Sequence, residues 1–238
     1  MIRILAAGVP VEIENRWSPI ARQCEAFYTD AAPVLAVSVT DADLEKERAA
    51  SLQESPSDAA LESIAVYRKL IDALLPYDVL MMHAAIVVLD GQAVAFAAPS
   101  GTGKTTHARL WCAHFGRRAE ILNGDKPLLR VCQDGFWAYG TPWKGKENLG
   151  TTGSAPLRAV CFLEQGAQNA IRSIGGAETL CRLVQQVLIP AREPELSLTL
   201  GLVDRLMEQL PFYVLSCTPE ESAVCTVYDR LKSEGFLS

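Results

Sequence analysis

A glycine-rich stretch in the middle of the chain carries the residue types that hold nucleotide phosphates. Residues 98–105 read APSGTGKT, which matches the phosphate-loop pattern G-x-x-x-x-G-K-[ST] except that alanine replaces glycine at the first position. Gly101 and Gly103 would let the backbone turn its N–H groups around an anion, and a following helix would add its dipole. The Lys104 ammonium could reach the outer phosphates, and the Thr105 hydroxyl could bind Mg²⁺.

The same residues would also suit a plain connector between a strand and a helix, with a surface lysine. The flanking segments favour the phosphate loop, because residues 92–98 are apolar and strand-like and residues 104–115 read as a helix. We therefore predict a site for a nucleoside triphosphate with Mg²⁺.

Phosphoryl transfer also needs a group that accepts the proton of the attacking hydroxyl. His83 precedes an apolar strand, and Asp125 and Glu164 each follow one, where P-loop enzymes place a magnesium-binding carboxylate. His83 could instead be a packed histidine, and Asp125 in NGDK a turn residue. The segment WKGKE at 143–147 is a further candidate, either a ligand-facing loop or a solvated one.

The segments around these residues predict a mixed α/β domain. Residues 84–89 and 92–98 are apolar, and the Asp90-Gly91 dipeptide between them predicts a tight hairpin, which excludes a purely parallel sheet. We expect further strands within 119–131, from 136 and at 158–165. Helix, helix, strand and helix would follow, the last opening with a capping box at Thr218 and Glu221.

The N-terminal part has a different pattern. Residues 1–40 read as short strands, 41–57 as an exposed polar connection, and the next helix begins at Ser57 or Asp58 and ends before Pro76. We therefore divide the chain into a β-rich region with one helix, residues 1–75, and a P-loop domain, residues 76–238.

Composition excludes several classes of protein. The chain has 238 residues and a formal net charge of −6, so it lacks the basic footprint of a nucleic-acid binder. Its apolar runs are too short to cross a membrane. The seven cysteines are scattered without a C-x-x-C pair, which predicts buried, reduced thiols in a cytoplasmic protein. The same scatter disfavours a zinc site.

Three segments together resemble a known family: MHAAIVVLDGQAVAFAAPSGTGKTTHARLW at 82–111, ILNGDKP at 121–127 and YGTPWKGKE at 139–147. They resemble the HPr kinase/phosphorylase-like family, in its bacterial HPr kinase-like serine kinase branch, which shares its nucleotide-binding fold with phosphoenolpyruvate carboxykinase. The resemblance covers roughly residues 80–165 and does not extend clearly over residues 1–75.

The resemblance implies roles for particular residues. A histidine 21 positions before the P-loop lysine belongs to the family's active site, and His83 stands 21 before Lys104. ATP phosphates would be bound by Ser100, Gly101, Thr102, Gly103, Lys104, Thr105 and Thr106. The family's Asp-Asp pair, which supplies a base and a metal contact, aligns with Gly124-Asp125, so its first acid is missing.

That substitution leaves alternatives open. Asp125 could act alone or with Asn123, or Glu147 or Glu164 could replace the missing acid. The first hypothesis is an ATP- and Mg²⁺-dependent kinase acting on a hydroxyl-bearing small molecule, peptide or protein, with His83, Lys104 and Asp125 as catalytic residues. The second is a nucleotide-binding regulatory or scaffold module without transfer, and the third, ranked last, is carboxykinase chemistry. The family's tendency to assemble also leaves a homo-oligomer open.

Overall fold

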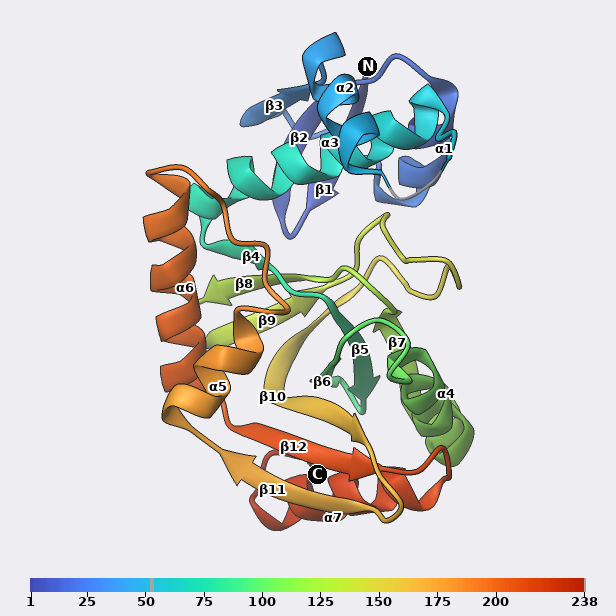
Figure 1. Ribbon diagram of the computed structural model, residues 1–238, viewed down its shortest axis with the longest axis vertical. Coiled ribbons are helices and arrows are strands. Elements are labelled where there is room, and N and C mark those ends of the chain that lie inside the picture. Colours follow the sequence, from blue (N-terminus) through green and yellow to red (C-terminus); the bar gives the residue numbers. More distant parts are fainter. Residues whose placement is uncertain (52–53, 238) are drawn as a thin grey trace.

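The computed structural model describes residues 1–51 and 54–237. Within them, a three-stranded sheet lies near the N-terminus, and a separate nine-stranded mixed sheet forms the body of the molecule (Figure 1). The predicted mixed α/β fold with a small separate N-terminal sheet is confirmed. The described part of residues 1–75 carries three α-helices, however, where one was predicted.

The N-terminal sheet follows from alternating apolar residues. Strands β1 (Ile2–Ala6) and β2 (Val9–Glu14) pair antiparallel, and β3 (Leu35–Ser38) pairs parallel to β2. Alternate β2 residues are buried, so one face of the sheet packs on helices. These helices are α1 (Ser18–Cys24), the short 3₁₀ helix η1 (Glu25–Phe27), α2 (Asp41–Ala50) and α3 (Asp58–Leu74).

Helix α2 corrects one prediction, because residues 41–57 were expected to form only an exposed connection. Thr40 and Asp43 make a capping box: the Thr40 hydroxyl accepts from the Asp43 N–H, and the Asp43 carboxylate accepts from the Thr40 N–H. Leu44 is the helix's buried apolar residue, so hydrophobic periodicity gave no helical signal. Helix α3 begins where predicted, with Ser57 as its N-cap.

The large sheet has the order β4-β8-β9-β10-β6-β5-β7, and β12 pairs with β10 and β11. The 3₁₀ helix η2 (Leu75–Tyr77) leads into it. The strands of the large sheet are β4 (Val79–Met81), β5 (Ala84–Leu89), β6 (Gln92–Ala97), β7 (Ala119–Asn123), β8 (Leu128–Cys132), β9 (Gly135–Tyr139), β10 (Ser154–Gln165), β11 (Ala170–Ile174) and β12 (Phe212–Cys217). The predicted hairpin is confirmed: Leu89 pairs with Gln92 across Asp90-Gly91.

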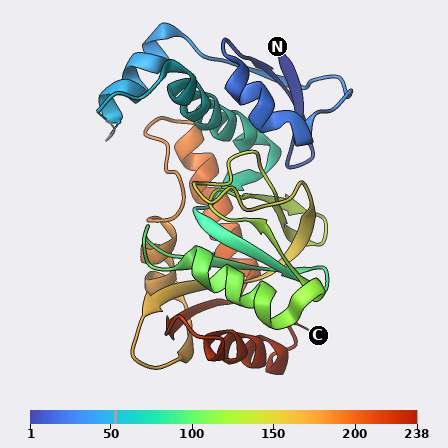
Figure 2. The same cartoon turned by 90° about the vertical axis from the view of Figure 1, so that its right-hand side faces the viewer.

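Two layers of helix cover the large sheet. Every residue of β5 is buried, with Ala85, Val87 and Leu89 facing one core and Ile86 and Val88 facing the other. The first core lies under α4 (Lys104–Phe115) and α7 (Ser222–Ser233), and the second lies under α5 (Gly176–Leu183) and α6 (Glu195–Gln209) (Figures 1 and 2). The 3₁₀ helix η3 (Gly116–Arg118) follows α4.

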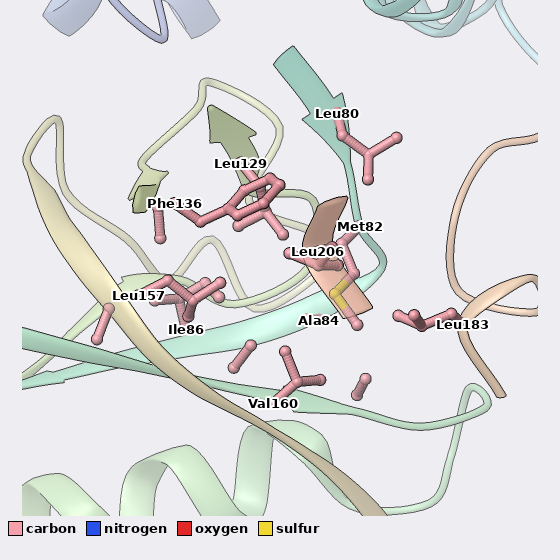
Figure 3. Close-up of a cluster of buried hydrophobic side chains, with 14 of the residues drawn as sticks. Leu80, Met82, Ala84, Ile86, Leu129, Phe136, Leu157, Val160, Leu183 and Leu206 are labelled. Atoms are coloured by element: carbon pink, nitrogen blue, oxygen red, sulfur yellow. The ribbon is translucent and has the colours of Figure 1, made fainter. Parts of the chain in front are cut away.

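Figure 3 shows the core beneath α5 and α6, where Met82 and Ala84 contribute to the same cluster as Leu183 and Leu206. His83 lies between Met82 and Ala84, and the burial of these two neighbours fixes the position of its backbone in the fold.

Three further expectations differ from the structure. Strand β11 was not predicted, because its residues are mostly exposed or half-buried. Helix α7 has no capping box: Glu221 is its N-cap without a side-chain bond, and Thr218 instead bonds Asn169. All seven cysteines are free, but only Cys24 and Cys161 are buried; four are half-buried and Cys181 is exposed.

The predicted boundary after residue 75 falls within η2, one residue beyond the end of α3, and the division into two domains there stays a prediction. Across the parts of the chain that the structure describes, no helix is long and apolar enough to cross a membrane.

The capping box yields a stability prediction. Replacing Thr40 with alanine removes the acceptor for the Asp43 N–H and should lower the free energy of unfolding by about 1 kcal/mol. Urea unfolding of Thr40→Ala measures this, with Thr40→Ser as the matched control because it keeps the hydroxyl. Equal stability of both variants and the wild type would contradict a contribution from this cap.

Candidate functional site

The loop between β6 and α4 has the geometry of a phosphate cradle. Gly101 and Gly103 have φ values of 85° and 117°, in the left-handed region that favours glycine. Gly103 caps α4 without any side-chain bond, so no side chain occupies the first N–H groups of the helix. Ala98 is not among the residues with positive φ, so alanine at the first motif position introduces no strain of this kind.

Lys104 is the first residue of α4 and its side chain folds back over the loop. The ammonium donates to the carbonyl oxygens of Ala98 at 2.7 Å and Pro99 at 3.4 Å, and the residue is 8% exposed. Burial lowers the pKa of Lys104, and the negative charge of Asp125 partly opposes that shift. Lys104 and Asp125 are therefore close enough to interact electrostatically.

His83 and Asp125 form a pair beside this lysine. The two atoms His83 Nε2 and Asp125 Oδ1 are 3.2 Å apart, and the Ala84 N–H donates to the Asp125 carbonyl at 3.2 Å. Burial alone would raise the pKa of Asp125, but the hydrogen bond from His83 and the charge of Lys126 outweigh burial and lower it. The structure thus brings His83, Lys104 and Asp125 together.

Asn123 shapes the turn that carries Asp125 instead of assisting it as an acid or base. Its side-chain oxygen accepts from the N–H groups of Asp125 at 2.9 Å and Lys126 at 2.8 Å. Its amide nitrogen donates to the Thr141 hydroxyl at 2.9 Å, and the residue has no exposed surface. Its hydrogen-bonding capacity is therefore used by the backbone turn and by Thr141.

The loop after β9 packs against the same turn. The Gly124 N–H donates to the Leu149 carbonyl at 2.9 Å, and a Cβ at position 124 would lie 3.3 Å from both Leu149 Cβ and Leu149 O. Gly145, with φ of +72°, leaves room for Asp125: a Cβ there would lie 2.8 Å from the Asp125 Cβ. The place of the missing acid is thus beside Leu149.

The two carboxylates considered as replacements are both ion-paired with arginines. Glu147 lies 2.7 Å from Arg109 of α4, and the Glu147 side chain is 54% exposed. Glu164 lies 2.7 Å from Arg182 of α5. Glu164 also lines a cleft of about 540 Å³ together with Ser100, Gly101 and Thr102, so it remains next to the phosphate loop.

Two side chains near the loop gave no signal in the sequence. Arg182 lines the cleft and also contacts Glu178 at 3.0 Å. The Gln186 amide nitrogen, in the orientation that satisfies its neighbours, donates to Ala98 O at 3.1 Å and to His83 O at 3.3 Å. A glutamine after a helix matches no motif, so only the fold could place it here.

Within residues 1–51 and 54–237, no cluster of three or more His, Cys, Asp or Glu side chains could hold a metal ion. A cation at this site would therefore depend on phosphate oxygens and water beside one or two protein ligands, which is the usual way proteins bind Mg²⁺. The predicted metal ligands Thr105, Asp125 and Glu164 stay predictions.

Comparisons with solved structures find a likeness at low sequence identity. The solved structure of the Hpr(Ser) kinase/phosphatase from Coxiella burnetii is 13% identical, with a TM-score of 0.37, and the match covers 66% of this chain and 93% of that chain. No curated protein matches the sequence.

A family match covers residues 57–190, which is more than half of the chain, from the N-cap of α3 through β10 and α5. The family is described as "SynChlorMet cassette protein ScmC", and the chain belongs to this ScmC family.

Proposed function

We propose that this protein is an ATP- and Mg²⁺-dependent kinase that transfers the γ-phosphoryl group to a hydroxyl of a small molecule, peptide or protein. One observation carries the proposal: Asp125, which pairs with His83, is near enough for its charge to act on Lys104. Lys104 begins a helix whose N-terminus has no side-chain cap. A binding loop beside a carboxylate that could receive an acceptor is the arrangement that phosphoryl transfer requires.

The loop would bind the β- and γ-phosphates. Backbone N–H groups from Ser100 to Thr106 would donate to the phosphate oxygens, and the Lys104 ammonium would leave Ala98 O for the outer phosphates. Arg182 lines the adjoining cleft and could add positive charge if its contact with Glu164 opened.

The donor set also fits Mg²⁺. The Thr105 hydroxyl and the Asp125 carboxylate are hard oxygen ligands, and a pair of such ligands with phosphates and water suffices for this ion. The bound ion would neutralise charge on the phosphates during transfer.

The transfer step would use Asp125 to orient the acceptor. The acceptor oxygen would form a bond to the γ-phosphorus, the bond to the oxygen bridging the β- and γ-phosphates would break, and ADP would leave with that electron pair. The acceptor proton would pass to Asp125. Because its pKa is lowered, Asp125 is a weak base, which suits a loose transition state in which the proton leaves late.

A second candidate is a nucleotide-binding module without transfer. The packing of Leu149 against Gly124 favours it, because the family's first acid has no room there without movement of the loop. The phosphate loop would serve binding in either case, so turnover separates the two candidates.

Removal of the loop lysine tests the phosphate site. Lys104→Ala should weaken Mg²⁺-ATP binding by roughly 10- to 100-fold, because a charge-assisted contact to phosphate is lost. Calorimetric titration with ATP, with and without Mg²⁺, measures the change, while a thermal melt checks the fold. Lys232→Ala in α7 is the control, since the Lys232 ammonium donates to the Tyr228 hydroxyl within the same helix. Equal ATP affinity in both variants would reject the site.

Restoring the missing acid at position 124 is expected to lower turnover rather than raise it. Gly124→Asp should lower turnover by roughly 10-fold or more, because its Cβ displaces Leu149 and the loop against Asp125. Gly124→Ala should show most of the same loss, since crowding rather than charge is responsible. A gain in Gly124→Asp alone would mean that the absent carboxylate limits the reaction.

The pH dependence of turnover tests the His83–Asp125 pair. Asp125 must be ionised to accept a proton, so activity is present above its pKa and falls as pH drops through it. Because the pKa is lowered, the acidic fall should lie below about 4, the usual carboxyl range. His83→Asn removes a contact that lowers the pKa and should shift the fall to higher pH. An unchanged acidic limb in that variant would contradict the pairing.

A further inference from the structure

Helix α3 of the N-terminal region contacts the turn that carries Asp125. The Tyr67 hydroxyl donates to the carbonyl of Lys126 at 3.0 Å, and the Thr141 hydroxyl donates to the same carbonyl at 2.8 Å. In Figure 1, α3 lies across the N-terminal sheet, and both lie above the large body of the molecule. Tyr67 therefore joins the first part of the chain to the residue that follows Asp125.

This bond completes the set that fixes the Asp125 backbone. The Asp125 N–H donates to Asn123 Oδ1 at 2.9 Å, and the Asp125 carbonyl accepts from the Ala84 N–H at 3.2 Å. The next carbonyl, that of Lys126, is the one that Tyr67 holds. With these groups bound, the main chain has little freedom to move the carboxylate away from His83.

The Tyr67 ring acts on the same carboxylate through Lys126. The Lys126 ammonium lies 5.9 Å from the centre of the Tyr67 ring and 3.4 Å from Asp125 Oδ2. Burial, and then the charge of Asp125, raise the pKa of Tyr67 well above its usual value, so the hydroxyl keeps its proton and stays a donor.

The other side of the site is tied to α3 as well. The Trp143 ring lies 4.4 Å from the Tyr67 ring, and the Trp143 indole N–H donates to the Ser63 carbonyl at 3.1 Å. Gln23 of α1 donates to the Pro142 carbonyl at 3.2 Å. This anchored segment leads directly to Gly145, which abuts the Asp125 side chain.

We propose that Tyr67 is a positioning residue for Asp125, and that the N-terminal region thereby sets the rate of phosphoryl transfer without touching the nucleotide. This inference rests on the proposed kinase function. Its distinguishing mark is a larger effect on kcat than on nucleotide affinity, because the phosphate loop makes none of these contacts and Asp125 is only one of the groups that would hold Mg²⁺-ATP.

The test compares two tyrosine-to-phenylalanine variants of the full chain. Tyr67→Phe removes the bond to Lys126 O and keeps the ring against Trp143. Tyr77→Phe is the control, since the Tyr77 hydroxyl donates to Val34 O of the N-terminal region at 3.4 Å and that bond involves no residue of the turn. We expect kcat to fall by about 3- to 10-fold in Tyr67→Phe, with a smaller change in the KM for ATP. Tyr77→Phe should match the wild type.

The proposal is overturned if kcat is equal in the two variants, or if KM for ATP rises in Tyr67→Phe while kcat does not change. A wild-type protein without turnover would reject the kinase function, and backbone hydrogen exchange would then decide the inference. Faster exchange at the amides of Asp125 and Lys126 in Tyr67→Phe alone supports the positioning role, and unchanged exchange removes it.

Discussion

The register of the β5–β6 hairpin is the constraint on which the site depends. The two-residue turn at Asp90-Gly91 makes Leu89 pair with Gln92, and the pairing then runs without a bulge to Ala84 and Ala97. His83 and Ala98 therefore leave the sheet side by side at its open end. The Gln186 amide spans the carbonyls of these two residues, and β7 adds Asp125 from the next strand. The separation of 21 residues between His83 and Lys104 follows from the length of this hairpin and the loop after it.

Much of this was visible in the sequence, because the decisive features are local. Glycine at 101 and 103, the Asp-Gly turn and the apolar residues on both faces of β5 each specify a conformation through neighbouring residues. His83 and Asp125 could be named as candidates, yet their contact required the pairing of β5 with β7, whose register contains an irregularity after Ile86. Spacing alone does not fix such a register.

The features that sequence reasoning missed share a different cause. Helix α2 and strand β11 are polar on much of their surface, so hydrophobic periodicity is weak in both. Tyr67 and Gln186 gave no sequence signal, because their partners lie 59 and 88 residues away in the chain. Ile64 has the helical spacing of the buried residues of α3 but is 47% exposed, so the buried stripe is narrower than spacing alone suggests.

The bonds of Lys104 have a consequence for ligand selection. Its ammonium already has two carbonyl acceptors, at 2.7 and 3.4 Å, so binding an anion there is an exchange of acceptors rather than a gain of one. A ligand with a single weakly basic oxygen offers little over the carbonyls it displaces. A polyphosphate offers several charged oxygens at once and can engage the helix N-terminus together with the lysine. In the proposed phosphate site, the folded-back lysine would therefore favour ligands with dense negative charge over smaller anions.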